Sequence, residues 1–140
     1  MTVQGRSVNR RSFLTDVWRL GVLALVAPDG ALAAVVPSPW RHPDPRPDVD
    51  GSKVLAKDAV MPHVAELFDE IRRIPHLADG VACRCGCGEI PGMRSLLSCY
   101  EGVGMAQFCQ ICEGDGRLVA RLAAQGKTLD EIRADIDRRG

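Results

Sequence analysis

The 140-residue sequence has few aromatic residues, no long apolar run and no excess of charge of either sign. With 18 basic and 18 acidic residues it lacks the basic surface by which proteins bind nucleic acid, so we expect no nucleic-acid partner. No apolar run approaches the roughly 20 residues that cross a bilayer, so we expect no stable membrane span. The absence of a Ser/His/Asp set or of paired carboxylates in a common frame argues against an enzyme that uses acid–base catalysis.

Residues 1–34 resemble an export signal. Residues 9–15 carry paired arginines followed by Phe-Leu, which is typical of twin-arginine signals. A short apolar stretch follows, and residues 31–33 have the small-x-small pattern of a signal-peptidase site. We predict cleavage after Ala33 or Ala34 and a periplasmic or otherwise extracytoplasmic protein. The alternative is an amphipathic N-terminal helix with a chance arginine pair.

This predicted signal also bears on the chemistry of the chain. The twin-arginine route exports proteins that have already folded in the cytosol, where thiols stay reduced, so cysteines would meet a metal before an oxidant. No cysteine lies near the cleavage site, which gives no support to a lipid anchor. Removing residues 1–34 takes away four arginines and two aspartates, which leaves a net charge near −2.

The segment 35–52 contains five prolines among polar residues. Such a composition favours extended conformations, so we predict a semi-rigid linker that precedes the folded domain. His42 lies in this segment, and we expect its side chain to be solvated rather than to act as a ligand.

Residues 53–140 are predicted to form a small, mainly helical domain of about three to four helices around a Cys-rich loop. In residues 56–74 apolar side chains recur with helical period, which predicts an amphipathic helix that ends before Pro75. The recurring residues are Val60, Val64, Leu67, Phe68 and Ile71. Residues 93–100 are predicted to form a short second helix. A domain of this size has a limited core, which a metal or covalent links often supplement.

Two further helices are expected toward the C-terminus. One runs from about Phe108 to Gln125, and Gly126 suits the position just past its end. Its expected inward residues are Ile111, Leu118, Val119 and Leu122. Thr128 and Glu131 form the T-x-x-E capping box of a last helix. The apolar face of that helix comprises Leu129, Ile132 and Ile136.

Six cysteines lie within one short part of the sequence, and they carry most of the functional information. Their pattern is C-x-C-x-C, then a single cysteine, then C-x-x-C. The residues are Cys83, Cys85, Cys87, Cys99, Cys109 and Cys112. Three interpretations remain open: a thiolate metal site, a thiol pair that exchanges with disulfides, and a set of structural disulfides.

The metal interpretation follows from the softness of thiolates, which select Cu(I), Zn(II) or Fe–S clusters. Gly86 and Gly88 allow the backbone to fold tightly, so that alternate sulfurs converge. A C-x-x-C at a helix start places two sulfurs near the positive end of the helix dipole. Met93 and Met105 could add thioether contacts, which suit Cu(I). A four-cysteine zinc site normally pairs two C-x-x-C knuckles, so the pattern favours copper over zinc.

The two other interpretations use the same cysteines. Cys109 and Cys112 have the spacing of a thioredoxin-like redox pair, although no βαβ pattern surrounds them. An even number of cysteines in a small exported chain is also typical of structural disulfides, which would give an interaction module without chemistry of its own. Three bridges from the five residues 83–87 would be crowded, because each disulfide requires a defined geometry.

Several motifs of the chain, taken in order, resemble the PCYCGC-motif proteins of bacteria. The motifs are CRCGC at residues 83–87, SLLSCY at 95–100, CQIC at 109–112 and GKTLDEIR at 126–133. The resemblance covers roughly residues 65–140 and implies a small exported protein or lipoprotein. Three residues depart from the family pattern. Ala82 stands where the family has Pro, Arg84 stands where it has an aromatic residue, and Met93 stands about where it tends to carry a His.

A weaker likeness is to cytochrome c maturation proteins of the CcmH type. Those proteins combine a short Cys motif with helices and a G-K-S-x-x-E-I segment near the end, which residues 126–132 resemble. This likeness would imply a periplasmic thiol reductant for apocytochrome c. It concerns the helix ends more than the cysteine spacing.

The resulting hypothesis is an exported thiolate protein that buffers or delivers a metal outside the cytoplasm. The metal would be a copper or zinc ion. The ligands would be Cys83, Cys85, Cys87, Cys109 and Cys112, with Cys99 as a sixth ligand or a packing thiol. A protein partner would be another exported metalloprotein or a redox protein.

Overall fold

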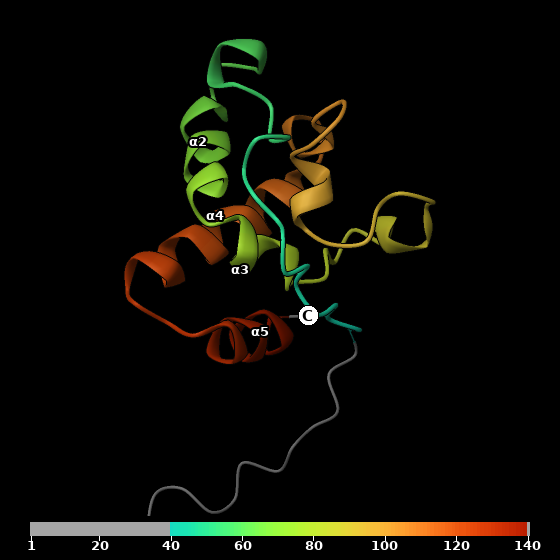
Figure 1. The fold of residues 1–140 in the computed structure, drawn as a ribbon, viewed down its shortest axis with the longest axis vertical. Helices are drawn as coiled ribbons and strands as arrows, with labels where there is room; N and C mark the ends of the chain where they lie inside the picture. The colour runs from blue at the N-terminus through green and yellow to red at the C-terminus, as the bar shows by residue number, and fades with distance from the viewer. Residues whose placement is uncertain (1–39, 140) are drawn as a thin grey trace, which may run out of the picture. The chain divides into compact units, whose positions relative to one another are not determined.

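Four α-helices carry the fold of residues 40–139, which are the residues that the computed structural model describes. They are α2 (Ala65–Arg73), α3 (Pro75–Asp79), α4 (Gln110–Ala124) and α5 (Leu129–Asp137) (Figure 1). Short 3₁₀ turns connect them: η1 (Lys57–Ala59), η2 (Cys87–Glu89), η3 (Leu97–Cys99) and η4 (Met105–Gln107). Within the described residues the only β pairing is an isolated bridge, so the prediction of a small, mainly helical domain is confirmed. The predicted signal lies outside them.

Helix α2 is shorter than the helix predicted for residues 56–74. It begins at Ala65, and η1 precedes it as a separate turn. Pro62 accounts for the difference, because a proline disfavours helical geometry in the residue before it. The apolar face is as predicted, with Leu67, Phe68 and Ile71 buried. Pro75 ends this run and also starts α3, where its missing N–H costs nothing.

The segment 93–100 forms only the turn η3, rather than the predicted short helix. Every residue of this turn is buried, as are its neighbours Leu96 and Tyr100. The Tyr100 ring packs on Phe68 of α2, with the ring centroids 4.7 Å apart. The segment therefore forms part of the core, and tertiary packing replaces local helical hydrogen bonds.

Helix α4 agrees with the prediction except at Ile111, whose side chain is 48% exposed. Cys112 takes the inward position of that turn and is fully buried. The inward face then continues through Val119 and Leu122, which follow Cys112 at seven and ten residues. Ile111 lies one position off this face, which is why the prediction for it was wrong.

Helix α5 begins at the capping box that the sequence predicts. The Glu131 amide donates to the Thr128 hydroxyl oxygen, and the Glu131 carboxylate accepts from the Thr128 amide. Gly126 joins α4 to α5 with a φ of 74°, as expected for the residue just past a helix end. Ile132 and Ile136 are buried, which confirms two of the three predicted inward residues, and Leu129 is partly buried.

Residues 40–52 run along the helical domain from beside α5 toward α2 (Figure 1). His42 Nδ1 accepts from the Ala82 amide at 3.0 Å, and His42 Nε2 lies 3.1 Å from an Asp137 oxygen. The expectation of a solvated His42 is therefore wrong, because its ring fills two hydrogen-bonding positions. Arg46 binds Asp79 through its backbone and its guanidinium. This part of the proline-rich segment is attached to the domain rather than spacing it.

The core lies where α2, α4 and residues 95–100 meet, and three cysteines belong to it: Cys83, Cys99 and Cys112. The chain segments that supply the remaining core residues thus also fix the positions of these thiols. Among residues 40–139, none of the helices is sufficiently long and apolar to cross a bilayer.

Candidate metal centre

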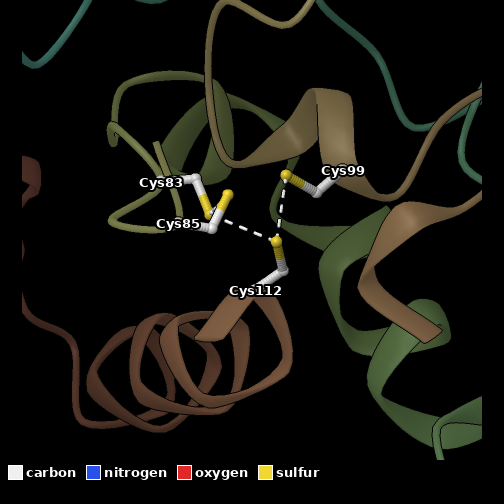
Figure 2. A group of neighbouring side chains, drawn as sticks. All are labelled: Cys83, Cys85, Cys99 and Cys112. Carbon is white, nitrogen blue, oxygen red and sulfur yellow. Dashed lines mark hydrogen bonds between the residues drawn. The ribbon is translucent and has the colours of Figure 1, made fainter. Parts of the chain in front are cut away.

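Four cysteine sulfurs converge at one point of the core. They come from Cys83, Cys85, Cys99 and Cys112, and all four sulfurs lie within 4.8 Å of one another. Figure 2 shows them pointing toward a common centre from the Cys-rich loop, from η3 and from the start of α4. The Sγ of Cys83 lies 3.2 Å from that of Cys85 and 3.3 Å from that of Cys112. The Cys112 and Cys99 sulfurs are 3.5 Å apart.

Cys83 and Cys85 point to the same side of the Cys-rich loop. Arg84, which lies between them in the chain, is bound on the other side. The Arg84 Nε donates to Asp115 at 2.8 Å, and the Arg84 amide donates to the same carboxylate at 3.2 Å. Asp115 is fully buried on α4, three residues after Cys112. A buried ion pair thus joins the loop to the helix that carries the fourth sulfur. Gly86, with a φ of 79°, then turns the chain.

Cys112 lies in the first turn of α4, near the positive end of the helix dipole, which favours a thiolate. Tyr100 fixes this turn, because its buried hydroxyl donates to the Cys112 carbonyl at 2.9 Å. Tyr100 is also the neighbour of Cys99 in the chain. One aromatic side chain therefore holds the segments of two cluster cysteines together.

The cluster shares its negative charge unequally. Hydrogen bonds with the Cys112 and Cys99 thiols lower the pKa of Cys83 to about 3, against the effect of burial. Burial, then contacts with the Cys87 and Cys83 thiols, raise the pKa of Cys85 to about 12. The contacts of Cys112 with Cys83 and Cys99, together with burial, also raise the pKa of Cys112. Without an ion, the four groups therefore act as one thiolate solvated by neighbouring thiols.

The dimensions of the cluster fit a single soft ion. Sulfurs bound at about 2.3 Å around a tetrahedral ion lie about 3.8 Å from one another. The separations of 3.2 to 3.5 Å and the overall limit of 4.8 Å lie around this value. All six cysteines are free thiols, and the cluster contacts are far longer than the roughly 2.05 Å of a disulfide. The donor set and its spacing are therefore compatible with a metal ion.

The two remaining predicted ligands, Cys87 and Cys109, are not among the four converging sulfurs. Cys109 is the N-cap of α4, and its sulfur accepts from the Cys112 amide at 3.4 Å, so it supports the helix start. Cys87 is half-buried and lies at the wall of a cleft beside the cluster. Met93 lines the same cleft, whereas Met105 packs partly buried against the core.

Arg84, Asp115 and Tyr100 are the supporting residues that the sequence analysis missed. Asp115 had a detectable signal, because an acidic residue three positions after Cys112 lies on the inward face of a predicted helix. A buried carboxylate requires a cation, and Arg84 is the residue between two of the predicted ligands. Tyr100 gave no such signal, since its role depends on a long-range contact with α4.

Comparisons with known proteins identify no relative. Neither the protein-family models, nor the curated proteins, nor the solved structures include a match to this chain.

Proposed function

We propose that this chain is an exported thiolate metal-binding protein that buffers or delivers a soft metal ion outside the cytoplasm. The observation that carries the proposal is the convergence of four free sulfurs from three chain segments within 4.8 Å. The export part rests on the twin-arginine pattern of residues 9–15 and the small residues at 31–33. The likeness to the PCYCGC-motif proteins, which are exported, supports the same proposal.

A metal accounts for this arrangement better than disulfides do. A disulfide joins two sulfurs only, so no pairing of the four sulfurs accounts for all three contacts between them. Cys83 contacts both Cys85 and Cys112, and Cys112 also contacts Cys99. A single ion bonds to all four sulfurs at once, which accounts for all of these contacts.

Zinc gains support relative to copper from the structure. Four thiolates are the usual ligand set of zinc, and the six-sulfur site with methionines that favoured Cu(I) is reduced to four sulfurs. Four thiolates carry a residual charge of about −2 around Zn(II) and about −3 around Cu(I). Arg84 and Arg94 already have carboxylate partners, Asp115 and Asp79. The smaller residual charge costs less to bury.

The test is metal analysis of the full chain, purified anaerobically from the exported fraction, with free thiols counted after denaturation in chelator. We expect about one equivalent of zinc or copper per chain, and six free thiols once the ion has been removed. Cys112→Ser is expected to lose the ion, as is Cys85→Ser, whose half-buried position makes the fold less dependent on it. Cys109→Ser, outside the cluster, is the matched control and retains the ion.

Two results would overturn the proposal. One is a protein without metal whose cysteines are all oxidised in pairs, since the cluster would then be a set of disulfides. The other is full metal content in both Cys85→Ser and Cys112→Ser, since the ion would then be bound elsewhere. Circular dichroism of each variant separates loss of a ligand from loss of the fold.

A further inference from the structure

A cleft of about 520 Å³ opens beside the sulfur cluster. Two cluster residues, Cys83 and Cys99, form part of its wall, and so do Cys87 and Met93. The cleft is therefore lined by two cluster cysteines and by two further residues with soft donor atoms. By contrast, Cys112 is fully buried in the first turn of α4, where Tyr100 bonds to its carbonyl, so the cluster is closed on that side.

Cys87 connects this cleft to the cluster. It follows the cluster residue Cys85 by two positions in the chain, and it lines the same cleft wall as Cys83 and Cys99. Its side chain is half-buried, so it remains accessible from solvent. The backbone around it is open, since a Cβ at Gly86 would meet nothing within 4 Å and one at Gly88 only a carbonyl at 3.9 Å.

We propose that this cleft is the route by which a soft metal ion reaches and leaves the cluster, and that Cys87 is the exchange ligand. The inference rests on the proposed function and deepens it, because a site for delivery must release its ion whereas a structural site need not. Closed structural sites enclose the ion with protein ligands on all sides. Here a fifth cysteine, Cys87, lines an open cleft together with two cluster residues, Cys83 and Cys99, and Met93 lines the same cleft.

The exchange step is a ligand substitution without a change of oxidation state. The Cys87 sulfur forms a bond to the ion as the bond from one cluster sulfur breaks. The proton that the Cys87 thiol gives up passes to the released sulfur, so charge and protons balance. An incoming thiolate of the acceptor can then displace Cys87 in the cleft in the same manner. Each step replaces one soft donor by another, which avoids a bare ion in the core.

The inference is tested on the metal-loaded full chain with zinc and a chromogenic chelator. Stopped-flow absorbance gives the transfer rate, and equilibrium competition gives the affinity. Cys87→Ser is expected to keep one ion per chain and an affinity within about threefold of the wild type, while transfer slows at least about tenfold, or about 1.4 kcal/mol in the barrier. Cys87→Met, which restores a soft donor, is expected to recover part of the rate.

Cys109→Ser is the matched control, because Cys109 is also half-buried and outside the four sulfurs but does not line the cleft. Serine is itself a good N-cap, so it can still accept from the Cys112 amide at the start of α4. It is expected to transfer zinc at the wild-type rate. Transfer by Cys87→Ser at the wild-type rate would overturn the inference. Loss of the ion from Cys87→Ser would also overturn it, since Cys87 would then be a resident ligand. A wild-type chain that takes up no ion contradicts the proposed function itself, so the two failures differ.

Discussion

Cys83 is the residue on which the charge of the sulfur cluster centres. Its pKa is lowered to about 3 by the thiols of Cys112 and Cys99, while the pKa values of Cys85, Cys99 and Cys112 are raised. Near neutral pH one sulfur is therefore already ionised, and the others must lose protons before they can bind a metal. The affinity for an ion consequently depends on pH in a defined way.

We predict that binding of one zinc ion near pH 7.5 releases about three protons rather than four. The affinity then rises with pH by about three logarithmic units per pH unit, because each raised thiol must ionise. Calorimetry in buffers of different ionisation enthalpy measures the proton count. A release of about four protons would show that Cys83 is a neutral thiol in the metal-free protein.

Arg84 and Asp115 provide the second test at the scale of the residue. Asp115 is fully buried and Arg84 is its partner, so Arg84→Ala leaves a buried carboxylate without a cation. We expect the free energy of unfolding to fall by about 3 kcal/mol and the zinc affinity to fall with it. Urea unfolding and chelator competition measure the two effects.

Arg117→Ala is the control for that experiment. Arg117 pairs with Glu113 at the surface of the same helix, and exposed pairs of this kind contribute little. Its unfolding free energy is expected to change by less than about 1 kcal/mol. Equal effects of Arg84→Ala and Arg117→Ala would mean that the buried pair does not hold the loop against α4.

At the scale of the element, α4 contains two glycines, Gly114 and Gly116, whose surroundings differ. A Cβ at Gly116 would lie 1.8 Å from the Tyr100 hydroxyl oxygen, whereas a Cβ at Gly114 would meet nothing within 4 Å. Gly116 therefore makes room for the tyrosine that fixes the first turn of α4, and Gly114 only lowers helix propensity.

We predict opposite effects for the two alanine substitutions. Gly114→Ala is expected to stabilise the protein by up to about 1 kcal/mol through helix propensity. Gly116→Ala is expected to destabilise it by about 1–3 kcal/mol, because Tyr100 has to move, and to weaken zinc binding. Thermal unfolding of the two variants is the measurement. Stabilisation by both would contradict the role assigned to Tyr100.

The sequence predicted those elements that depend on local signals. The capping box at Thr128, the turn at Gly126 and the apolar face of α2 are present as expected. The turn η3 and the exposed side chain of Ile111 were not predictable in this way. Both depend on packing between segments far apart in the chain, which local periodicity does not contain.

At the scale of the whole described domain, Asp79 joins segments that are distant in the sequence. This fully buried carboxylate of α3 accepts from Arg46, Arg94 and Ser95. Burial raises its pKa, but hydrogen bonds from Arg46 and Ser95 outweigh this and lower the pKa to about 2. The Asp79 carboxylate thus binds both residues 40–52, through Arg46, and the segment before Cys99, through Arg94 and Ser95.

The lowered pKa of Asp79 predicts how stability depends on acid. A carboxylate with a depressed pKa stabilises the fold above its unfolded value of about 3.9, and this contribution is lost as the pH falls toward about 2. The loss amounts to about 2 kcal/mol. Asp79→Asn is expected to be less stable at pH 7 but to lose less on acidification to pH 2. Urea unfolding against pH is the measurement, and parallel profiles for both proteins would contradict the assignment.

The site as a whole was only partly predictable. The spacing of the cysteines indicated that two half-sites face each other, and the structure brings together sulfurs from both halves and from Cys99. The sequence did not distinguish Cys112, which points into the core, from Cys109, which caps the helix. That distinction follows from the orientation of α4, which the Arg84–Asp115 pair and the Tyr100 hydrogen bond determine.

X-ray absorption at the metal edge of the anaerobically purified full chain tests the central claim most directly. One ion bound by four sulfurs at about 2.3 Å is the result expected for zinc at Cys83, Cys85, Cys99 and Cys112. Cys109→Ser is expected to give the same spectrum, since its sulfur lies outside the four. A first shell of nitrogen and oxygen atoms, or a protein that carries no metal, would contradict the claim.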